Sequence, residues 1–211
     1  MHQYDDADQS AQEHWENRYA EKEQIWSGRV NAHLPTRTAD LTPGRALDLG
    51  CGEGGDAVWL ARHGWQVVAV DIATNALRRA EAAAIAEGVE GRIDFRQHDL
   101  SDSFPDGSFD LVSAQFLHST VRLEREQVLR KAAAAVEPGG TLLIVDHGEA
   151  PPWATDHVHH HVFPSAQEVV AALELSDQWH REHIGPVERD AVGPDGQKAT
   201  LIDNLMVLRR T

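Results

Sequence analysis

From residue 45 onward, short apolar segments alternate with longer amphipathic segments, and this order constrains the fold more than any other feature of the chain. Regular alternation of strands and helices is typical of βαβ units, whose strands lie parallel in one sheet. The predicted strands are residues 46–49, 66–70, 92–96, 109–114 and 141–145, and the predicted helices are residues 55–63, 73–87 and 122–136. We therefore expect an α/β fold, with helices on both faces of a doubly wound, mostly parallel sheet in three α/β/α layers.

The pattern changes after residue 165. A predicted helix over residues 165–173 precedes two extended stretches, 179–192 and 199–208, which are separated by Pro194-Asp195-Gly196. A Pro-Asp-Gly tripeptide between two extended stretches indicates a hairpin. The last two strands are therefore expected to be antiparallel neighbours, which brings the sheet to seven strands.

The first 40 residues differ in texture from the rest and look like an appended cap. Residues 11–23 are predicted to form a helix that carries Trp15, Arg18 and Tyr19, and Trp26-Ser27-Gly28 follows as an irregular stretch. A chain of 211 residues suits one domain, because domains commonly contain about 100 to 200 residues. We expect an N-terminal helical cap or lid over residues 1–40 and a ligand-binding domain over residues 41–211.

The segment Asp48-Leu49-Gly50-Cys51-Gly52-Glu53-Gly54-Gly55 lies where the first predicted strand passes into the first predicted helix. Glycines at this point allow a tight turn and let a ligand approach the backbone, at the sheet edge where open α/β folds bind their ligands. Gly50, Gly52 and Gly55 also match the G-x-G-x-x-G spacing of dinucleotide-binding loops. The spacing alone leaves two alternatives, a nicotinamide dinucleotide and another adenosine-containing ligand.

Charge favours the second alternative. Glu53 and Asp56 stand where a pyrophosphate would lie over the helix N-terminus, and Asp48 comes just before the first glycine. These carboxylates disfavour a doubly anionic group. A ligand with a cationic centre and an amino group, such as S-adenosylmethionine, would be attracted by the acidic rim that they form.

Two further acidic residues follow later strands. Asp71 comes at the end of the second predicted strand, 21 residues beyond Gly50, where a carboxylate accepts hydrogen bonds from ribose hydroxyls. Asp99 follows the third strand and could take the amino group of an adenine ring flanked by Ile72 and Leu100. The alternatives are an exposed strand-end aspartate for Asp71 and a helix-cap or turn role for Asp99.

These residues resemble the class I, seven-stranded, Rossmann-like methyltransferases that depend on S-adenosylmethionine. The resemblance covers residues 45–210 and rests on LDLGCGEG at 47–54, Asp71, Asp99, FDLV at 109–112 and LRKAAAAVEPGGTLLIV at 129–145. It implies a transferase that moves a methyl group to an acceptor by in-line displacement and releases S-adenosylhomocysteine. It also implies cofactor contacts from Asp48, Gly50, Cys51, Gly52, Asp71, Ile72, Asp99, Leu100 and Gln115, with Cys51 as a small packing residue rather than a nucleophile.

The front of the chain resembles a narrower group. HWENRY at 14–19, with WSG at 26–28, is similar to the small-molecule branch that includes tellurite-resistance and thiopurine-type enzymes, in which an N-terminal helix closes over the cofactor. By that analogy Arg18 would pair with the methionine carboxylate, and Tyr19 and Trp26 would wall the methyl-transfer site. A packed amphipathic helix without such contacts is the alternative.

Histidines supply the candidate bases. Methyl transfer mainly requires positioning of the acceptor and exclusion of water, but an oxygen or a protonated amine also has to lose a proton. His118 at the end of the fourth strand and His147 after the fifth strand are expected near the cofactor. Residues 157–161 hold four further histidines, for which a solvated loop is preferred over substrate lining or metal binding, and no metal is expected.

Composition narrows the partners. A formal net charge of −15 opposes binding to nucleic acid, and the fourth strand lacks the Asn/Asp-Pro-Pro-aromatic motif of enzymes that methylate DNA bases. Apolar runs stay far below the roughly 20 residues that cross a bilayer, and the single cysteine suits a cytoplasmic protein. We expect a small-molecule acceptor, no nucleic acid and no membrane. A noncatalytic sensor of an adenosyl ligand and an NAD-dependent oxidoreductase remain as alternatives.

Overall fold

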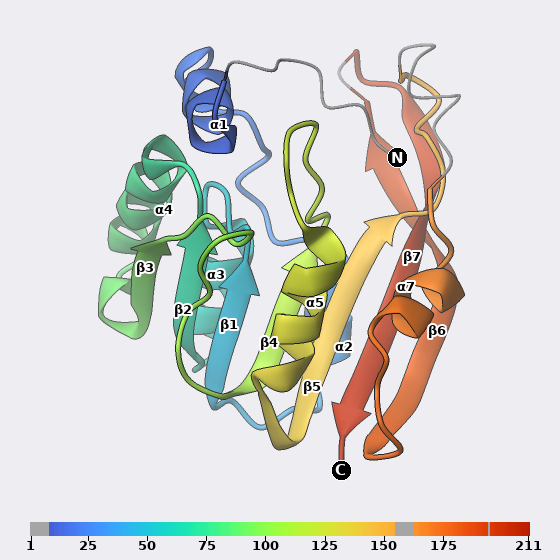
Figure 1. The fold of residues 1–211 in the computed structure, drawn as a ribbon. Coiled ribbons are helices and arrows are strands. Elements are labelled where there is room, and N and C mark those ends of the chain that lie inside the picture. The colour runs from blue at the N-terminus through green and yellow to red at the C-terminus, as the bar shows by residue number, and fades with distance from the viewer. Residues whose placement is uncertain (1–8, 155–162, 194) are drawn as a thin grey trace.

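The computed structural model describes residues 9–154, 163–193 and 195–211, and within them the chain forms one seven-stranded sheet (Figure 1). The strands are β1 (Arg45–Leu49), β2 (Gln66–Asp71), β3 (Ile93–Gln97), β4 (Phe109–Gln115), β5 (Val136–His147), β6 (Trp179–Val192) and β7 (Lys198–Arg210). Their order across the sheet is β3-β2-β1-β4-β5-β7-β6. β1 to β5 run parallel, whereas β7 is antiparallel to β5, and β6 is antiparallel to β7.

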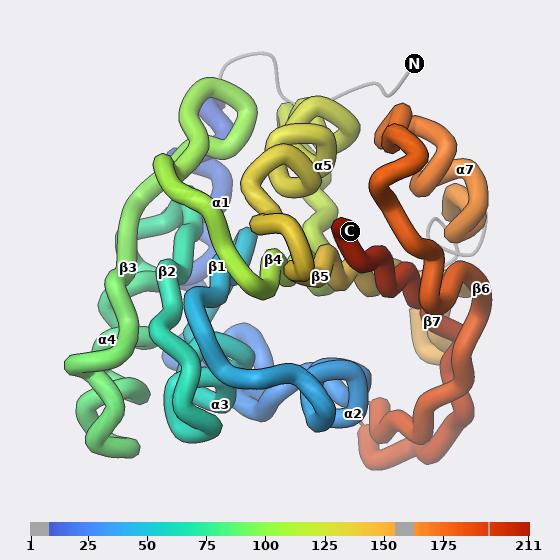
Figure 2. The backbone as a smooth tube through the Cα atoms, turned by 90° about the horizontal axis from the view of Figure 1, so that it is seen from below, coloured from blue at the N-terminus to red at the C-terminus, as the bar shows by residue number. Residues whose placement is uncertain are grey.

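Helices cover both faces of this sheet, which gives three layers (Figure 2). They are α1 (Ala11–Ala20), α2 (Leu34–Thr38), α3 (Gly55–Arg62), α4 (Thr74–Ala86), α5 (Arg125–Ala134) and α7 (Ala166–Ala172), with a short 3₁₀ helix, η1 (Glu90–Arg92). α5 and α7 lie on one face, and α2, α3 and α4 lie on the other. The predicted fold class is confirmed, including the antiparallel hairpin at the end of the chain.

Some element boundaries differ from the prediction. α1 ends at Ala20 rather than at residue 23, and α5 is shorter at both ends than the predicted helix over residues 122–136. Val136 belongs to β5, where it pairs with Phe109 of β4 before the register shifts. α2 has no counterpart in the prediction, because five residues are too few to show a helical period.

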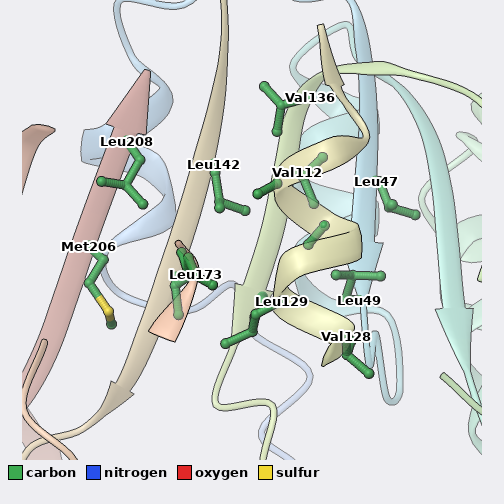
Figure 3. Packing of buried hydrophobic residues seen from close by; sticks show 14 of the residues in the cluster. Leu47, Leu49, Val112, Val128, Leu129, Val136, Leu142, Leu173, Met206 and Leu208 are labelled. Carbon is green, nitrogen blue, oxygen red and sulfur yellow. The ribbon is translucent and has the colours of Figure 1, made fainter. Parts of the chain in front are cut away.

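Each face of the sheet buries its own hydrophobic cluster. Under α5, side chains of neighbouring strands such as Leu47, Val112 and Leu142 pack with Leu129 of the helix (Figure 3). The cluster on the opposite face includes Leu34 of α2, which is fully buried. Burying one such leucine stabilises a fold by about 1.5 to 3 kcal/mol, so the sheet provides a rigid base for the residues at its edge.

Across residues 9–154, 163–193 and 195–211, no helix is long and apolar enough to cross a membrane. The same ranges hold no group of three or more His, Cys, Asp or Glu side chains placed to bind a metal ion. The histidines of residues 157–161 lie outside the described residues, so their role stays a prediction.

Candidate functional site

The glycine loop, residues 50–54, joins the carboxyl end of β1 to α3. Gly50, Gly52 and Gly54 have φ angles of +69°, +54° and +85°. Residues with a side chain adopt this left-handed region only with strain. A Cβ atom on Gly54 would lie 2.7 Å from the Cβ of Ala80 in α4. The loop therefore needs glycine both for its turn and for its close approach to the next helix.

Asp71, at the end of β2, holds this loop in place. Its Oδ2 accepts a hydrogen bond from the backbone N–H of Gly52 at 2.9 Å, and its Oδ1 accepts one from Ala73 at 2.9 Å. The side chain is almost inaccessible, and burial raises its pKa to about 6 although the backbone donors oppose that shift. The structure thus places a buried carboxyl group beside the glycine loop at the predicted ribose position.

Asp48 lies beneath the loop and keeps an unsatisfied oxygen. Its residue exposure is 3%, and its Oδ2 atom has no hydrogen-bond partner among the described residues. Burial, followed by the charges of Asp56 and Asp71, raises the pKa of Asp48 well above its ordinary value. A buried acceptor without a partner is costly, so a hydrogen-donating or cationic ligand group would fit this position.

Gln115 adds a second unsatisfied acceptor on the same face of the sheet. Asp48 of β1 pairs in register with Ser113 of β4, and the Nε2 of Gln115 donates to the Ser113 hydroxyl at 3.3 Å. The Oε1 atom of Gln115 is buried and has no partner in the described part of the chain. The sequence-predicted residues Asp48 and Gln115 are therefore brought to one edge.

Tyr19 and Trp26 cover the glycine loop from the N-terminal segment. The indole Nε1 of Trp26 donates to the Tyr19 hydroxyl at 2.9 Å, and a Cβ on Gly52 would lie 3.2 Å from both side chains. Tyr19 is buried, whereas Trp26 is 47% exposed. Arg18 is exposed, with its guanidinium carbon 5.7 Å from the ring centroid of Trp15 and 5.9 Å from that of Trp26.

Glu53 fastens this segment to the loop. Its carboxylate accepts hydrogen bonds from the backbone N–H groups of Ile25 at 3.1 Å and Trp26 at 2.9 Å, and it pairs with Arg79 at 2.6 Å. Arg79 also donates to the backbone carbonyls of Tyr19 and Lys22. The carboxylate that the sequence places in an acidic rim for a ligand is instead neutralised by Arg79 and used to hold the N-terminal segment.

Two other carboxylates act in the same way. Asp56 accepts hydrogen bonds from the backbone and side-chain nitrogens of Asn31, each at 2.7 Å. Glu16 of α1 accepts bonds from the backbone N–H groups of Thr74 and Asn75, at the free N-terminus of α4. In Figure 1, α1 accordingly lies above α4 at the carboxyl edge of the sheet. The prediction that Glu53 and Asp56 form an acidic rim for a ligand is therefore wrong, because both carboxylates bind groups of the N-terminal segment. The Oδ2 atom of Asp48 still has no partner among the described residues.

The residues predicted around an adenine ring are spread over two environments. Ile72 is partly buried and packs with the cluster that contains Tyr19, while Leu100 is buried in the core under α5. Asp99 accepts a hydrogen bond from the backbone N–H of Ser101 at 3.0 Å, which is the turn role left open by the sequence. Cys51 is buried, and burial raises the pKa of its thiol well above the ordinary value, so it packs as a neutral thiol.

The segment after β4, residues 116–120, contacts both the glycine loop and α1. Phe116 has a φ angle of +52°, which is unusual for a residue with a side chain. The Cδ1 atom of Leu117 would lie 2.7 Å from a Cβ on Gly50, and the Ser119 hydroxyl accepts a hydrogen bond from the Trp15 indole at 3.1 Å. This segment therefore touches both the loop and the helix that covers it.

The two candidate bases meet at the ends of β4 and β5. The rings of His118 and His147 are stacked with centroids 5.9 Å apart, and His147 also contacts the ring of Phe116 at 4.6 Å. Burial, and then the neighbouring His118, lower the pKa of His147. Asp146 lies 3.2 Å from His118, a contact that no sequence pattern predicts although Asp146 directly precedes His147.

Comparison with known proteins supports this arrangement of loop and sheet. A family model described as a methyltransferase domain matches residues 47–144, from β1 into β5. The phosphatidylethanolamine N-methyltransferase of Cereibacter sphaeroides is 35% identical over 171 residues, which are 79% of this chain and 78% of that protein. The 27-O-demethylrifamycin SV methyltransferase of Amycolatopsis mediterranei is 32% identical over 74% of this chain and 57% of its own length.

Another relative acts on a different kind of molecule. The ribosomal RNA small subunit methyltransferase C of Alcanivorax borkumensis is 34% identical over 56% of this chain. The matched region is 37% of that protein, and for four of the curated relatives it lies between 37% and 57% of their length. The chain thus spans about half, or less, of those proteins.

Two solved structures show the same fold. One, described as "Conversion of a Disulfide Bond into a Thioacetal Group during Echinomycin Biosynthesis", has a TM-score of 0.72 and 25% identity over 94% of this chain and 92% of that chain. A SAM-dependent methyltransferase from Geobacter sulfurreducens in complex with S-adenosylhomocysteine has a TM-score of 0.51 and 25% identity over 64% of this chain and 56% of that chain. The chain belongs to the family of S-adenosylmethionine-dependent methyltransferases.

Proposed function

We propose that the chain binds S-adenosylmethionine at the glycine loop and transfers its methyl group to a small-molecule acceptor. The observation that carries this proposal is the buried carboxyl group of Asp48, whose Oδ2 atom lacks a partner among the described residues. A cationic or hydrogen-donating ligand group would satisfy this atom, whereas a pyrophosphate would not. When bound, the cofactor supplies a methyl group that its positively charged sulfur has already activated.

The residues at the carboxyl edge of the sheet bind different parts of the cofactor. Asp48 and Gln115 offer their free acceptors to the amino group of the methionine part of the cofactor. Asp71 keeps a lone pair on each oxygen after its two backbone hydrogen bonds, and it accepts the ribose hydroxyls with them. The remaining members of the proposed cofactor site are Gly50, Cys51, Gly52, Ile72, Asp99 and Leu100.

The N-terminal segment acts as a lid in this proposal. Residues 11–31 are held to the glycine loop and to α4 by hydrogen bonds to carboxylates, by Arg79 and by a small apolar cluster in which Tyr19 packs with Ala73 and Ala76. Such polar contacts can break and re-form as a cofactor enters. Closure by Tyr19 and Trp26 excludes water from the transfer site, and Arg18 pairs with the carboxylate of the cofactor.

The acceptor side lies beyond Gln115, where His118 and His147 are the candidate bases. Two relatives carry the names of acceptors of low molecular weight, phosphatidylethanolamine and a demethylrifamycin, and the net charge of −15 opposes a phosphate backbone. These points favour a small molecule over ribosomal RNA. The tellurite-resistance and thiopurine-type enzymes remain the narrower resemblance.

Calorimetric titration tests the cofactor assignment directly. We expect heat from S-adenosylmethionine and from S-adenosylhomocysteine, and none from NAD. Asp48→Asn should weaken binding by roughly 10- to 100-fold, because a hydrogen bond to a charged group is worth about 1.5 to 3 kcal/mol. Asp94→Asn is the matched control and should bind normally, since that exposed carboxylate on β3 pairs with Arg96. Binding of NAD alone would refute the proposal and favour the oxidoreductase.

Turnover distinguishes an enzyme from a sensor. Purified protein with S-adenosylmethionine should release S-adenosylhomocysteine in the presence of a panel of small alcohols, phenols and amines. Ribosomal RNA, tested in the same assay, should give no S-adenosylhomocysteine. A protein that binds the cofactor but yields no S-adenosylhomocysteine with any acceptor would instead be an adenosyl-ligand sensor.

A further inference from the structure

Asp146 and Arg125 lie directly behind His118. Nε2 of His118 is 3.2 Å from Oδ1 of Asp146, which is 2% exposed near the end of β5. Arg125, the first residue of α5, donates Nη2 to both oxygens of Asp146 at 2.5 and 2.6 Å. Its Nε donates to the backbone carbonyl of Leu117 at 2.9 Å. One guanidinium therefore fixes both the carboxylate and the chain next to His118.

This arrangement determines where the imidazole proton resides. Nε2 of His118 is buried and has no aligned hydrogen-bond partner among the described residues, with Asp146 within ion-pair distance. Such contacts are often poorly aligned without substrate and tighten in the complex. Burial alone would raise the pKa of Asp146, but His118 and Arg125 lower it below its ordinary value, so the carboxylate is ionised. A neutral His118 ring that donates to this carboxylate carries its proton on Nε2, which leaves the lone pair on Nδ1.

His147 is placed differently, although it is also a histidine at the same edge. Its ring packs between those of Phe116 and Phe163, with centroid distances of 4.6 and 5.9 Å. Burial lowers its pKa, so it stays neutral at physiological pH. By contrast, the side chain of His118 is 33% exposed and has a carboxylate beside it. His147 is therefore a packing residue between aromatic rings. His118 is accessible and has a carboxylate beside it, as a general base requires.

The turn that carries His118 packs against the glycine loop. The backbone N–H of His118 donates to the carbonyl of Phe116 at 2.8 Å, which closes a tight turn with the left-handed φ of Phe116. Leu117 packs against Gly50 of the glycine loop. Strained backbone of this kind costs about 1 to 3 kcal/mol and is retained where the surrounding structure or function requires it.

We infer that Asp146 and Arg125 are positioning residues that make His118 the base for an acceptor with a proton-bearing oxygen or nitrogen. The inference rests on the proposed methyl transfer. For a hydroxyl acceptor, its oxygen forms a bond to the methyl carbon, and the carbon–sulfur bond breaks with its electron pair passing to sulfur. The hydroxyl proton goes to Nδ1 of His118, and the resulting imidazolium is stabilised by the Asp146 carboxylate. A nucleophile without a proton would gain nothing from this arrangement.

A spectroscopic test of the pair uses the protein saturated with S-adenosylhomocysteine, the complex in which the contact is expected to align. Imidazole N–H protons held by a carboxylate give resonances downfield of the backbone amides in spectra of ¹⁵N-labelled protein. Asp146→Asn should remove the resonance of His118 and leave that of His33, which lies 2.9 Å from Asp203. Asp203→Asn is the matched control, because this buried carboxylate also binds an arginine and a histidine. It should remove the resonance of His33 and leave that of His118. A downfield spectrum unchanged by Asp146→Asn overturns the pairing.

Kinetics test the acceptor class. At about pH 8 phenol still needs a base, whereas 4-nitrophenol is largely ionised. Iodide and dimethyl sulfide carry no transferable proton. Asp146→Asn and His118→Gln should each lower kcat with phenol by about 100-fold, with a much smaller loss for 4-nitrophenol and little change in KM. The double variant should be no slower than His118→Gln, because the two residues act as a unit.

The contrary outcomes are distinct from failure of the proposed function. Equal losses for phenol and 4-nitrophenol mean that Asp146 is merely structural and overturn the inference. Two results overturn the acceptor class. In the first, S-adenosylhomocysteine is released with iodide or dimethyl sulfide but with neither phenol nor 4-nitrophenol. In the second, the cofactor binds but none of the four probes gives release. Absence of binding by either form of the cofactor would instead reject the proposed function itself.

Discussion

Replacing Asp71 with Asn should change how the stability of the ligand-free protein depends on pH. The residue is 7% exposed, and its pKa is about 6 against an ordinary value of 3.8. At about 1.4 kcal/mol per unit, this shift corresponds to about 3 kcal/mol. Burial of the charge is its largest cause, and Asn removes the charge while keeping the shape.

The sign follows from proton linkage. The folded protein holds the Asp71 proton more tightly than the unfolded chain, so this group contributes its full stability below about pH 4. That contribution is lost as pH rises to about 6, and above it the free energy of unfolding is lower by about 3 kcal/mol. Asn does not titrate, but its single oxygen leaves the N–H of Gly52 or Ala73 without an acceptor. This loss costs about 1 to 3 kcal/mol at every pH.

The assay is urea unfolding followed by tryptophan fluorescence at a series of pH values from 4 to 8. The free energy of unfolding of Asp71→Asn, minus that of the wild type, should increase by about 2 to 2.5 kcal/mol from pH 4 to pH 7. Asp94→Asn, at an exposed site, should show no comparable trend. A difference that stays flat with pH would refute the reasoning that burial makes Asp71 costly when ionised. At neutral pH the same substitution should also weaken binding of S-adenosylhomocysteine.

Three further predictions concern the loop, the lid and the core. Gly52→Ala should lower the free energy of unfolding by about 1 to 2 kcal/mol and weaken cofactor binding in calorimetry, because its φ is +54° and the new Cβ would crowd Trp26. Arg79→Met should release the lid from Glu53 and speed limited tryptic cleavage of the N-terminal segment about tenfold, as expected for losing about 1.4 kcal/mol of closure, and an unchanged rate would contradict the role of the clamp. Leu142→Ala should lower the free energy of unfolding by about 2 to 5 kcal/mol in chemical denaturation, and a cost below 1 kcal/mol would contradict its place in the core.

Much of the fold could be predicted from sequence because its signals are local. Segments buried on both faces of a parallel sheet are continuously apolar, as in residues 142–145, and the alternation with helices predicts that the strands lie parallel. The glycine loop was equally readable, since its positive φ angles require glycine. Asp71 also lies beside Gly52, because the loop and the end of β2 meet at one edge.

The partners of the acidic residues could not be predicted in the same way. Glu53 lies next to Arg79 and the backbone of Trp26 only after α4 and the N-terminal segment have packed together. Asp146 likewise meets Arg125 and His118 through tertiary packing. Charge counted along the sequence overestimated the acidity that a ligand would meet, because residues distant in sequence neutralise part of it.

A crystal structure of the protein with S-adenosylhomocysteine would test the central claim most directly. The account places the ribose at the Asp71 carboxylate and the amino group of the amino-acid part at Asp48, with Tyr19 and Trp26 closed over the ligand. The sulfur should then face the side of the site that carries His118. Ligand density elsewhere on the molecule, or an amino group turned away from Asp48, would contradict the account.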